Sequence, residues 1–309
     1  MIGILLAKKI ASMFVIIAMG FIIVKAGILK TKESRQFSLL ALYVITPCMI
    51  LSSFQIDLTD EVRHGFLLAM LGGVIIHTVT ILMTQILGKV IGLDSVEKVS
   101  VVYTNSGNLL IPIILTLFGK EWVVYTSGYN MILNLLLWTH GKAILSGDKK
   151  PDFLKIVTNS NMIAIFIGLI LMFTGVRFPA ILADAIDSVG AMVGPICMIV
   201  TGMLIAGMDM KKVMSYKRAW IPVFLRLIVT PLIVMTIYRT SGLASLTPNG
   251  ATVLTVSMLA CSAPSATSVI QMAQTFQSDA AADYAAAINV IGTLLCIFTM
   301  PVMITLFTL

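Results

Sequence analysis

Long apolar stretches alternate with short charged ones along the whole chain. The windows without Asp, Glu, Lys or Arg cover residues 10–24, 36–56, 64–88, 99–119, 122–141, 156–176, 188–208, 227–238, 240–278 and 284–309. A helix needs about 20 mostly apolar residues to cross the hydrocarbon core of a bilayer. The window at 227–238 extends upstream past Arg226, and the window at 240–278 holds a turn at 246–250 followed by one span. The pattern predicts an all-α membrane protein with ten transmembrane helices.

The composition fits lipid rather than water as the solvent. Of the 309 residues, 58% are hydrophobic and 11% are charged, whereas a soluble domain carries roughly 25% charged residues. The mean hydropathy is +1.01. Together these values exclude a cytosolic enzyme and a secreted disulfide scaffold.

Basic residues are unevenly distributed over the loops. With ten spans, fourteen Lys and Arg lie on the side of the loops after helices 1, 3, 5, 7 and 9, and six lie on the side of the termini. Cytoplasmic loops carry an excess of Lys and Arg, so we expect a multi-pass protein of the cell membrane with both termini outside and the central loop in the cytoplasm. The net charge of +7 then reflects this bias and contact with the lipid bilayer, and no basic-aromatic stretch indicates a nucleic acid partner.

A polar connection at 146–159 divides the chain into two sets of five helices, at 1–145 and 160–309. An odd number of spans per half places the second half in the opposite membrane orientation. This arrangement predicts an inverted repeat, which is a common plan of secondary transporters. Helices 2 and 7 each carry a proline in mid-span, Pro47 and Pro195, at which we expect the helix to be disturbed.

Helices 4 and 9 contain residues that interrupt a helix near mid-depth. Helix 4 carries Asn105, Ser106, Gly107 and Asn108 before Pro112, and helix 9 carries Ser262, Pro264, Ser265 and Thr267. Asn, Ser and Gly favour turns, and proline leaves the carbonyl four residues before it without a donor. The carbonyls freed in this way belong to Asn108 and Ala260. Irregular backbone at membrane depth is tolerated only where protein or a cavity covers it, so the paired breaks predict a binding site at the bilayer midplane.

The predicted site favours an anion. Each half-helix that begins at a break presents unpaired N–H groups and the positive end of its dipole, and two such ends suit a carboxylate. The Asn, Ser and Thr side chains at the breaks supply further neutral donors. The structural alternative is that the prolines only kink packed helices.

These motifs resemble the auxin efflux carrier family, which includes plant auxin exporters and bacterial carriers of malate- and malonate-like acids. The resemblance rests on residues 20–29, on residues 43–51, on Asn105-Ser106-Gly107 followed by Pro112, and on residues 263–266 with the run through Gln271 and Ala273. It implies a ten-helix inverted repeat in which helices 4 and 9 cross. It also implies that helices 1, 2, 6 and 7 form a scaffold, and that helices 3–5 and 8–10 form a transport domain that moves past it.

The resemblance further implies efflux or exchange of small organic anions at the crossing, by a protein that is not an enzyme and needs no cofactor. It implies a polar side chain on helix 5 near the substrate, and Asn134 matches that position best. Plant members carry charged residues on helix 3, whereas residues 65–88 contain no Asp, Glu, Lys or Arg. A plant-like auxin substrate is therefore not the expectation, and a homodimer is left open.

Two ionisable side chains fall inside predicted spans. His77 in helix 3 and Arg226 in helix 8 are candidates for coupling or gating, because ionisable groups within a membrane are functional candidates by default. The structural alternatives are a neutral histidine bonded to a neighbouring helix and an arginine that extends to the interface. No carboxylate falls at mid-depth, which argues against a cation–proton antiporter. Four isolated cysteines without neighbouring histidines predict no metal site.

Three functions remain open on the sequence. The leading one is a secondary carrier of small organic anions. The second is a sodium-coupled organic-anion symporter that resembles the bile-acid carriers. The third is a membrane sensor or scaffold that transports nothing.

Overall fold

The computed structural model describes the backbone of residues 2–148 and 153–309, and the side chains of the same residues except 2–10, 107, 108 and 153. Within these ranges every regular element is helical, as predicted. The first half contains α1 (Ile2–Lys25), η1 (Thr31–Glu33), α2 (Ser34–Leu40), η2 (Ala41–Ile45), α3 (Thr46–Ser53), α4 (Asp60–Val90), α5 (Ser95–Val102), η3 (Ser106–Leu110), α6 (Ile111–Leu117), η4 (Lys120–Trp122), α7 (Val123–Leu136), η5 (Leu137–Gly141) and α8 (Lys142–Ser146).

The second half contains a similar series of long and short helices. These are α9 (Phe153–Val157), α10 (Ser160–Thr174), α11 (Ala180–Gly190), α12 (Val193–Ala206), α13 (Met210–Ser215), η6 (Lys217–Ala219), α14 (Trp220–Phe224), η7 (Leu225–Val229), α15 (Thr230–Thr240), η8 (Leu243–Ser245), α16 (Gly250–Cys261), α17 (Thr267–Phe276) and α18 (Asp279–Thr308).

Five helical stretches of the described chain are long and apolar enough to cross a membrane. They are Thr31–Ser53, Asp60–Val90, Ala180–Ala206, Lys217–Thr240 and Asp279–Thr308. Shorter apolar helices cover Ala11–Lys25, Ser160–Thr174 and Gly250–Cys261. The windows at 99–119 and 240–278 fold into interrupted helices, and the count of ten spans stays a prediction.

Wide helical turns precede three of the prolines. The π-helical segments η2, η3 and η7 continue without a gap into α3, α6 and α15, and Pro47, Pro112 and Pro231 stand in the first turns of these helices. A wide turn makes room for a ring that has no N–H to donate and that would clash with the preceding turn. Pro47 and Pro112 therefore disturb their helices by widening the preceding turn, but neither proline ends its helix. Pro195 is the third residue of α12, just after the turn at 191–192.

Glycines bring several helices into close contact. A Cβ atom at Gly20 of α1 would overlap the Ile199 carbonyl of α12, and one at Gly202 of α12 would overlap the Ile17 carbonyl of α1. Close backbone approach of this kind is how helices associate in lipid, where the hydrophobic effect adds little. In the same way, Gly168 of α10 accommodates the ring of Phe54 at the end of α3. Small residues thus hold α1 against α12 and α3 against α10.

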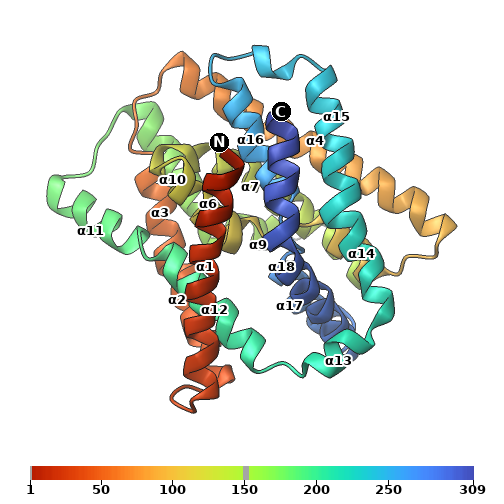
Figure 1. Cartoon of the computed structure of the whole chain (residues 1–309). Helices are drawn as coiled ribbons and strands as arrows, with labels where there is room; N and C mark the ends of the chain where they lie inside the picture. The colour runs from red at the N-terminus through yellow and green to blue at the C-terminus, as the bar shows by residue number, and fades with distance from the viewer. Residues whose placement is uncertain (1, 149–152) are drawn as a thin grey trace.

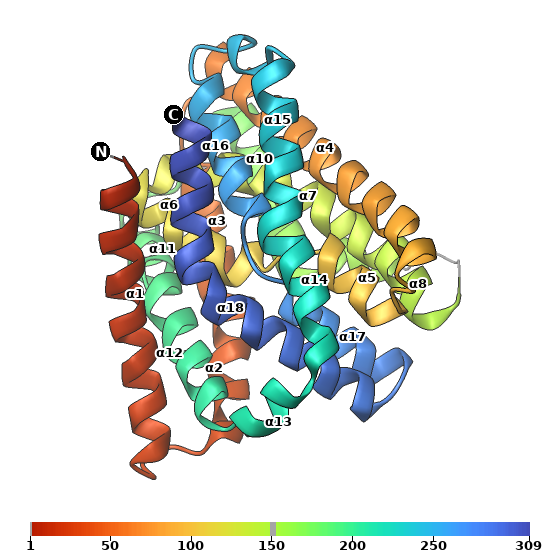
Figure 2. The ribbon, with the colours of Figure 1, turned by 45° about the vertical axis from the view of Figure 1, so that its right-hand side comes forward.

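The helix α18 lies in the middle of the fold, where it contacts α1, α5, α14, α16 and α17. In Figure 2, α1 and α12 lie on one side of the molecule, α4, α5 and α8 lie on the other, and α18 runs between them. The α1–α2 connection lies at the bottom of this view and the connection between α15 and α16 at the top, so the two groups of helices are staggered (Figures 1 and 2). The interruptions after α5 and after α16 therefore lie inside the fold.

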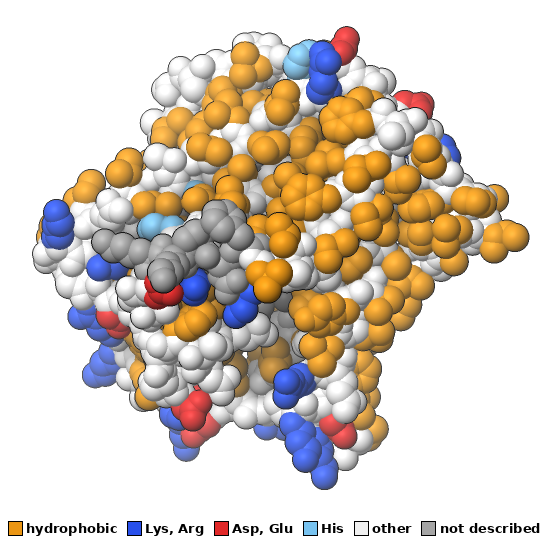
Figure 3. All heavy atoms as spheres, turned by 180° about the vertical axis from the view of Figure 1, so that it is seen from behind, with side chains coloured by type: hydrophobic (Ala, Val, Ile, Leu, Met, Phe, Trp, Pro, Cys, Tyr) orange, Lys and Arg blue, Asp and Glu red, His pale blue; other side chains and the backbone are white. Residues whose placement is uncertain are grey.

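The outer surface is apolar, as expected for a protein surrounded by lipid. Seen from behind, hydrophobic side chains cover a broad band, and most Lys, Arg, Asp and Glu lie towards its margins (Figure 3). Exposed large apolar side chains include Ile86, Ile170 and Phe298, which are 62%, 62% and 71% accessible. Exposed apolar surface on this scale would be a liability in water.

The α1–α12 contact predicts a difference between two glycines of the same helix. We expect Gly202→Ala to lower the free energy of unfolding by about 1–3 kcal/mol, because its Cβ overlaps the backbone of α1. Gly194→Ala is the matched control, since its nearest neighbour is the Pro112 Cβ at 3.6 Å. Thermal unfolding of the detergent-purified variants measures both. Equal midpoints for the two variants would contradict the packing argument.

Candidate functional site

The two interrupted helices meet at their interruptions. Residues 103–105 separate α5 from η3, and residues 262–266 separate α16 from α17. In these two stretches the backbone pairs as an isolated antiparallel bridge between Thr104 and Ser265. Both windows in which breaks were predicted are therefore interrupted, and the first interruption ends at Asn105, the first residue of the Asn-Ser-Gly motif.

Two backbone hydrogen bonds hold this junction together. The N–H of Asn105 donates to the carbonyl of Pro264, and the N–H of Ala266 donates to the carbonyl of Tyr103, both at 2.9 Å. Groups that a continuous helix would pair internally are thus paired across the two breaks. An unpaired buried amide would cost a substantial part of the protein's stability, so this exchange makes the interruptions tolerable inside an apolar fold.

Arg226 satisfies the carbonyl groups that the breaks leave without helical partners. Its side chain is buried, with 2% of the residue accessible. Nη1 donates to the carbonyl of Val101 at 3.0 Å, Nε donates to that of Ala263 at 3.1 Å, and Nη2 donates to that of Ala260 at 3.3 Å. Ala260 is the carbonyl that the sequence predicted to be freed by Pro264. The guanidinium therefore caps the C-terminal ends of α5 and α16 together, and it does not extend to the interface.

Several predicted site residues lie at the junction. The buried Ser106 hydroxyl donates to the side-chain oxygen of Asn130 in α7. The carbonyl of Ser265 accepts a hydrogen bond from Asn289 Nδ2 in α18 at 2.5 Å. Ser262 is fully buried, and its hydroxyl has no hydrogen-bond partner in the described structure. Thr267 is the first residue of α17.

Three further predicted residues, Gly107, Asn108 and Asn134, follow the first break in the chain. The side chains of Gly107 and Asn108 lie outside the described residues. Asn134 donates through Nδ2 to the carbonyl of Asn130 at 2.9 Å, within its own helix α7. From the same helix, the Tyr129 hydroxyl lies 3.4 Å from Thr104 Oγ1 in the break, and Asn130, one turn before Asn134, bonds to Ser106 just after it. The role of Asn134 near a substrate stays a prediction. The spacing of four residues between Asn130 and Asn134, on the same helix face, is the signal that could have identified Asn130.

His77 lies against the aromatic residues beside the junction. The residue is fully buried, and its ring centroid lies 5.8 Å from that of Tyr103 and 5.6 Å from that of Tyr129. Nδ1 lies 2.7 Å from the carbonyl of Gly73, to which it can only donate, and Nε2 has no partner in the described structure. Nδ1 therefore carries a proton, and the ring is bonded within its own helix. Its role in coupling stays a prediction.

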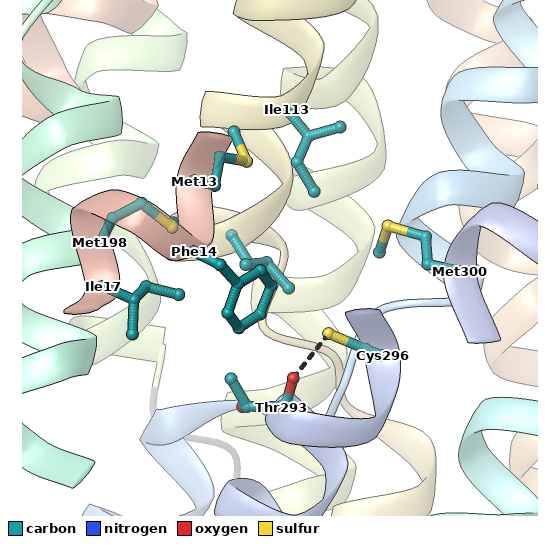
Figure 4. Close-up of a pocket in the computed structure, with 9 residues that line it drawn as sticks. Met13, Phe14, Ile17, Ile113, Met198, Thr293, Cys296 and Met300 are labelled. Atoms are coloured by element: carbon teal, nitrogen blue, oxygen red, sulfur yellow. Dashed lines mark hydrogen bonds between the residues drawn. The ribbon is translucent and has the colours of Figure 1, made fainter. Parts of the chain in front are cut away.

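A small apolar cavity adjoins the helices that follow the first break. Its volume is about 20 Å³, which is close to the space of one water molecule. The residues around it come from α1, η3, α6, α12 and α18, and Figure 4 shows eight of them labelled, with a hydrogen bond from the Cys296 thiol to the Thr293 carbonyl. The labelled residues are Met13, Phe14, Ile17, Ile113, Met198, Thr293, Cys296 and Met300. The cavity is too small for a carboxylic acid, so α1 and α12 must separate from α6 and α18 before a ligand enters here.

Comparison with known proteins agrees with this arrangement. A model of the membrane transport protein family matches residues 5–152 and, a second time, residues 149–304. The chain belongs to this family, which is that of the auxin efflux carriers. No curated protein matches the chain closely enough to count as a relative.

Membership of this family confirms the coarser predictions. The protein is a multi-pass membrane transporter and not an enzyme. The double match means that two similar repeats cover the chain. Within the described residues, no group of three or more His, Cys, Asp or Glu could hold a metal ion.

One carboxylate is buried at the start of α5, ahead of the first break. Glu97 has no accessible surface, and its Oε1 accepts hydrogen bonds from Arg218 Nε and from the Tyr284 hydroxyl, both at 2.7 Å. The backbone N–H of Asp94 donates to Oε2 at 2.9 Å. Burial raises the pKa of the Glu97 carboxyl, but these hydrogen bonds, with that of Arg218 the strongest, together hold the pKa below its usual value. The cluster joins α5, η6 and α18.

We expect Arg226→Gln to lower the stability of the folded protein by several kcal/mol, about 1–3 kcal/mol for each carbonyl left unpaired. Arg226→Lys should recover part of the loss, because an ammonium carries the charge but cannot reach three separated carbonyls in the guanidinium geometry. Arg239→Gln is the control, since Arg239 is exposed and donates to the carbonyls of Leu306 and Phe307. Thermal unfolding in detergent should give the highest midpoint for Arg239→Gln, a lower one for Arg226→Lys and the lowest for Arg226→Gln. An Arg226→Gln midpoint as high as that of Arg239→Gln would contradict this prediction.

The Glu97 cluster predicts a loss of stability in acid. Because the pKa of Glu97 is lower in the folded chain than in the unfolded one, its contribution is present above the unfolded value of about 4.3 and is lost as the pH falls through the folded value. The unfolding midpoint of the wild type should therefore fall more steeply below about pH 5 than that of Glu97→Gln. Glu121→Gln, which changes an exposed carboxylate, should follow the wild type. Parallel profiles for wild type and Glu97→Gln would exclude this role.

Proposed function

We propose that the protein is a secondary carrier that exports or exchanges small organic anions, such as carboxylates, by alternating access. The observation that supports this proposal most directly is that the carbonyl ends and the N–H ends of the broken helices differ in their partners. Arg226 satisfies the carbonyl ends of α5 and α16, whereas η3 and α17 begin beyond the breaks with the N–H groups of their first turns. A cation behind the junction and helix N-termini in front of it favour a negatively charged ligand.

The same observation favours an anion carrier over a sodium-coupled symporter. In carriers with broken helices, carbonyl groups at the ends of half-helices coordinate the sodium ion. Here the carbonyls of Val101, Ala260 and Ala263 already accept hydrogen bonds from a guanidinium. A second cation at these oxygens would be repelled at short range in a medium of low dielectric constant. The Arg226 guanidinium thus takes the place at these carbonyls that a sodium ion would occupy. We therefore expect transport without sodium.

The proposed motion is that of a transport domain, helices 3–5 and 8–10, past a scaffold of helices 1, 2, 6 and 7. The stagger of the two groups in Figure 2 fits a transport domain near one end of its travel. Exposed ion pairs span the boundary at both ends, from Lys120 to Asp187 at 2.6 Å and from Lys212 to Asp283 at 2.5 Å. Exposed pairs of this kind are screened by water and contribute little to stability, so they can break and reform during a transport cycle.

The proposed orientation places both termini outside and the central loop in the cytoplasm, with ten spans in two inverted repeats whose fourth and ninth helices cross. The excess of basic residues in the loops after the odd-numbered helices supports it. A membrane sensor or scaffold without transport activity remains the alternative of another class, and it needs no cavity that opens.

Counterflow in proteoliposomes tests the proposal. We expect labelled monocarboxylates or dicarboxylates to exchange across the membrane at the same rate in sodium and in choline buffers. Asn105→Ala and Asn130→Ala should reduce that rate at least about tenfold, since each removes a polar side chain at the break. Asn249→Ala, which makes no side-chain hydrogen bond ahead of α16, is the matched control.

The outcomes separate the three functions. Sodium-dependent exchange would favour the symporter, and the absence of exchange for every acid under any imposed gradient would favour the sensor. Undiminished rates in both junction variants, with folding preserved, would move the substrate site away from the breaks.

A further inference from the structure

A hollow lined mainly by polar residues lies among α4, α5 and the η5–α8 segment, on the far side of Tyr103 from the paired breaks. Its volume is about 470 Å³. The lining residues are Thr84, Gln85, Ser95, Lys98, His140 and Ile144. The hollow is open to the surroundings, and it lies on the side that the sequence predicts to be cytoplasmic. Neither the family match nor the proposed transport cycle assigns a role to it.

Lys98 brings a positive charge to this hollow without a partner of its own. Its ammonium group forms no ion pair or hydrogen bond with any described residue. The carboxylate next to it in sequence, Glu97, is already engaged by Arg218 and by Tyr284. A lysine that lines a cavity and has no counter-ion favours an anionic ligand.

Gly88 positions the lysine. A Cβ atom at Gly88 of α4 would lie 2.6 Å from Cε and 3.2 Å from Nζ of Lys98. The end of the lysine side chain therefore lies directly against α4, in space that a glycine leaves free. This contact fixes the ammonium group at the hollow more closely than a freely extended surface lysine.

His140 adds a second group of defined orientation. The Tyr103 hydroxyl donates its proton to the carbonyl of Leu136 at 2.8 Å, and it also lies 2.9 Å from Nδ1 of His140. Because the hydroxyl has one proton, Nδ1 must donate to it. Nε2 is then the nitrogen of His140 that is left free of this bond, and it forms none with a described residue. Tyr103 thus fixes the tautomer of a histidine that borders the hollow.

The surface beside the hollow is apolar and exposed. Leu82, Ile86 and Val90 follow one another at intervals of four along α4, next to Gln85, and they are 52%, 62% and 74% accessible. Residues at this spacing share one face of a helix. Further up the same helix, Leu67 and Leu71 are also exposed. An acyl chain could lie along this face with its head group at the hollow.

We propose that the hollow at Lys98 binds the phosphate head group of an anionic glycerophospholipid from the cytoplasmic leaflet. Basic pockets between transmembrane helices on the cytoplasmic side are suited to anionic head groups. Lys98 supplies the charge, Gln85 and Ser95 supply neutral polar groups, and the α4 face supplies the apolar contact that a free phosphate would not use. The lipid would tie together the cytoplasmic ends of α4, α5 and α8.

Binding of short-chain lipids to the detergent-purified full chain tests the proposal. Dioctanoyl phosphatidylglycerol should raise the unfolding midpoint more than dioctanoyl phosphatidylcholine, and inorganic phosphate at the same concentration should have no effect. Lys98→Gln should weaken the affinity for phosphatidylglycerol about tenfold, as expected for the loss of one charge-assisted contact. Lys98→Arg should retain most of it.

Two further variants separate position from charge. Gly88→Ala keeps every charge but displaces the end of Lys98, so it should also weaken binding. Lys32→Gln removes an exposed lysine from the loop after α1, on the same predicted side, and should leave binding unchanged. Midpoints measured without lipid show that each variant is folded.

Three results would overturn the proposal. They are equal shifts with phosphatidylcholine, an unchanged affinity in Lys98→Gln, and an equal shift with inorganic phosphate, which would make the hollow a site for soluble anions. None of these results depends on which acid the protein transports, so the lipid site and the transport function fail independently.

Discussion

The contact of one guanidinium with three backbone carbonyls is the constraint on which the centre of this fold depends. Two helices that stop inside an apolar environment leave carbonyl groups without donors, and water cannot replace them there. Arg226 supplies donors to the ends of α5 and α16 at once. Backbone pairing at Thr104 and Ser265 completes the junction. The guanidinium hydrogen bonds and the backbone pairing together make both interruptions tolerable inside the fold.

The two buried charged side chains of the described residues have different kinds of partner. Among the described residues that are buried, the charged side chains are Arg226 and Glu97. Glu97 is matched by the opposite charge of Arg218, so that pair is close to neutral. Arg226 is matched by neutral carbonyl dipoles, and its positive charge remains uncompensated at the junction. A fold with few charged residues thus places one net charge where a ligand of opposite sign is proposed to bind.

The same apolar fold also has to move if it transports. Glycine contacts at Gly20 and Gly202 hold α1 and α12 tightly together, whereas exposed ion pairs such as Lys120 with Asp187 cross towards the other helices. Close packing is costly to open, and exposed pairs are not. This difference fits the proposed boundary between scaffold and transport domain, and the cavity of about 20 Å³ lies between α1 and α12 on one side and α6 and α18 on the other.

The apolar pattern by itself determined the solvent, the all-helical class and the approximate position of both breaks, because these follow from local hydropathy and from proline chemistry. It also identified Ala260 as a carbonyl that lacks the donor four residues later, because that residue is Pro264. Only the tertiary structure decided that Arg226 provides the donor, since its carbonyl partners lie 34, 37 and 125 residues away. For the same reason it brought Asn130 to Ser106 and showed that Pro47 and Pro112 follow wide turns. Helical periodicity says which residues share a face, but it does not say which helices that face will meet.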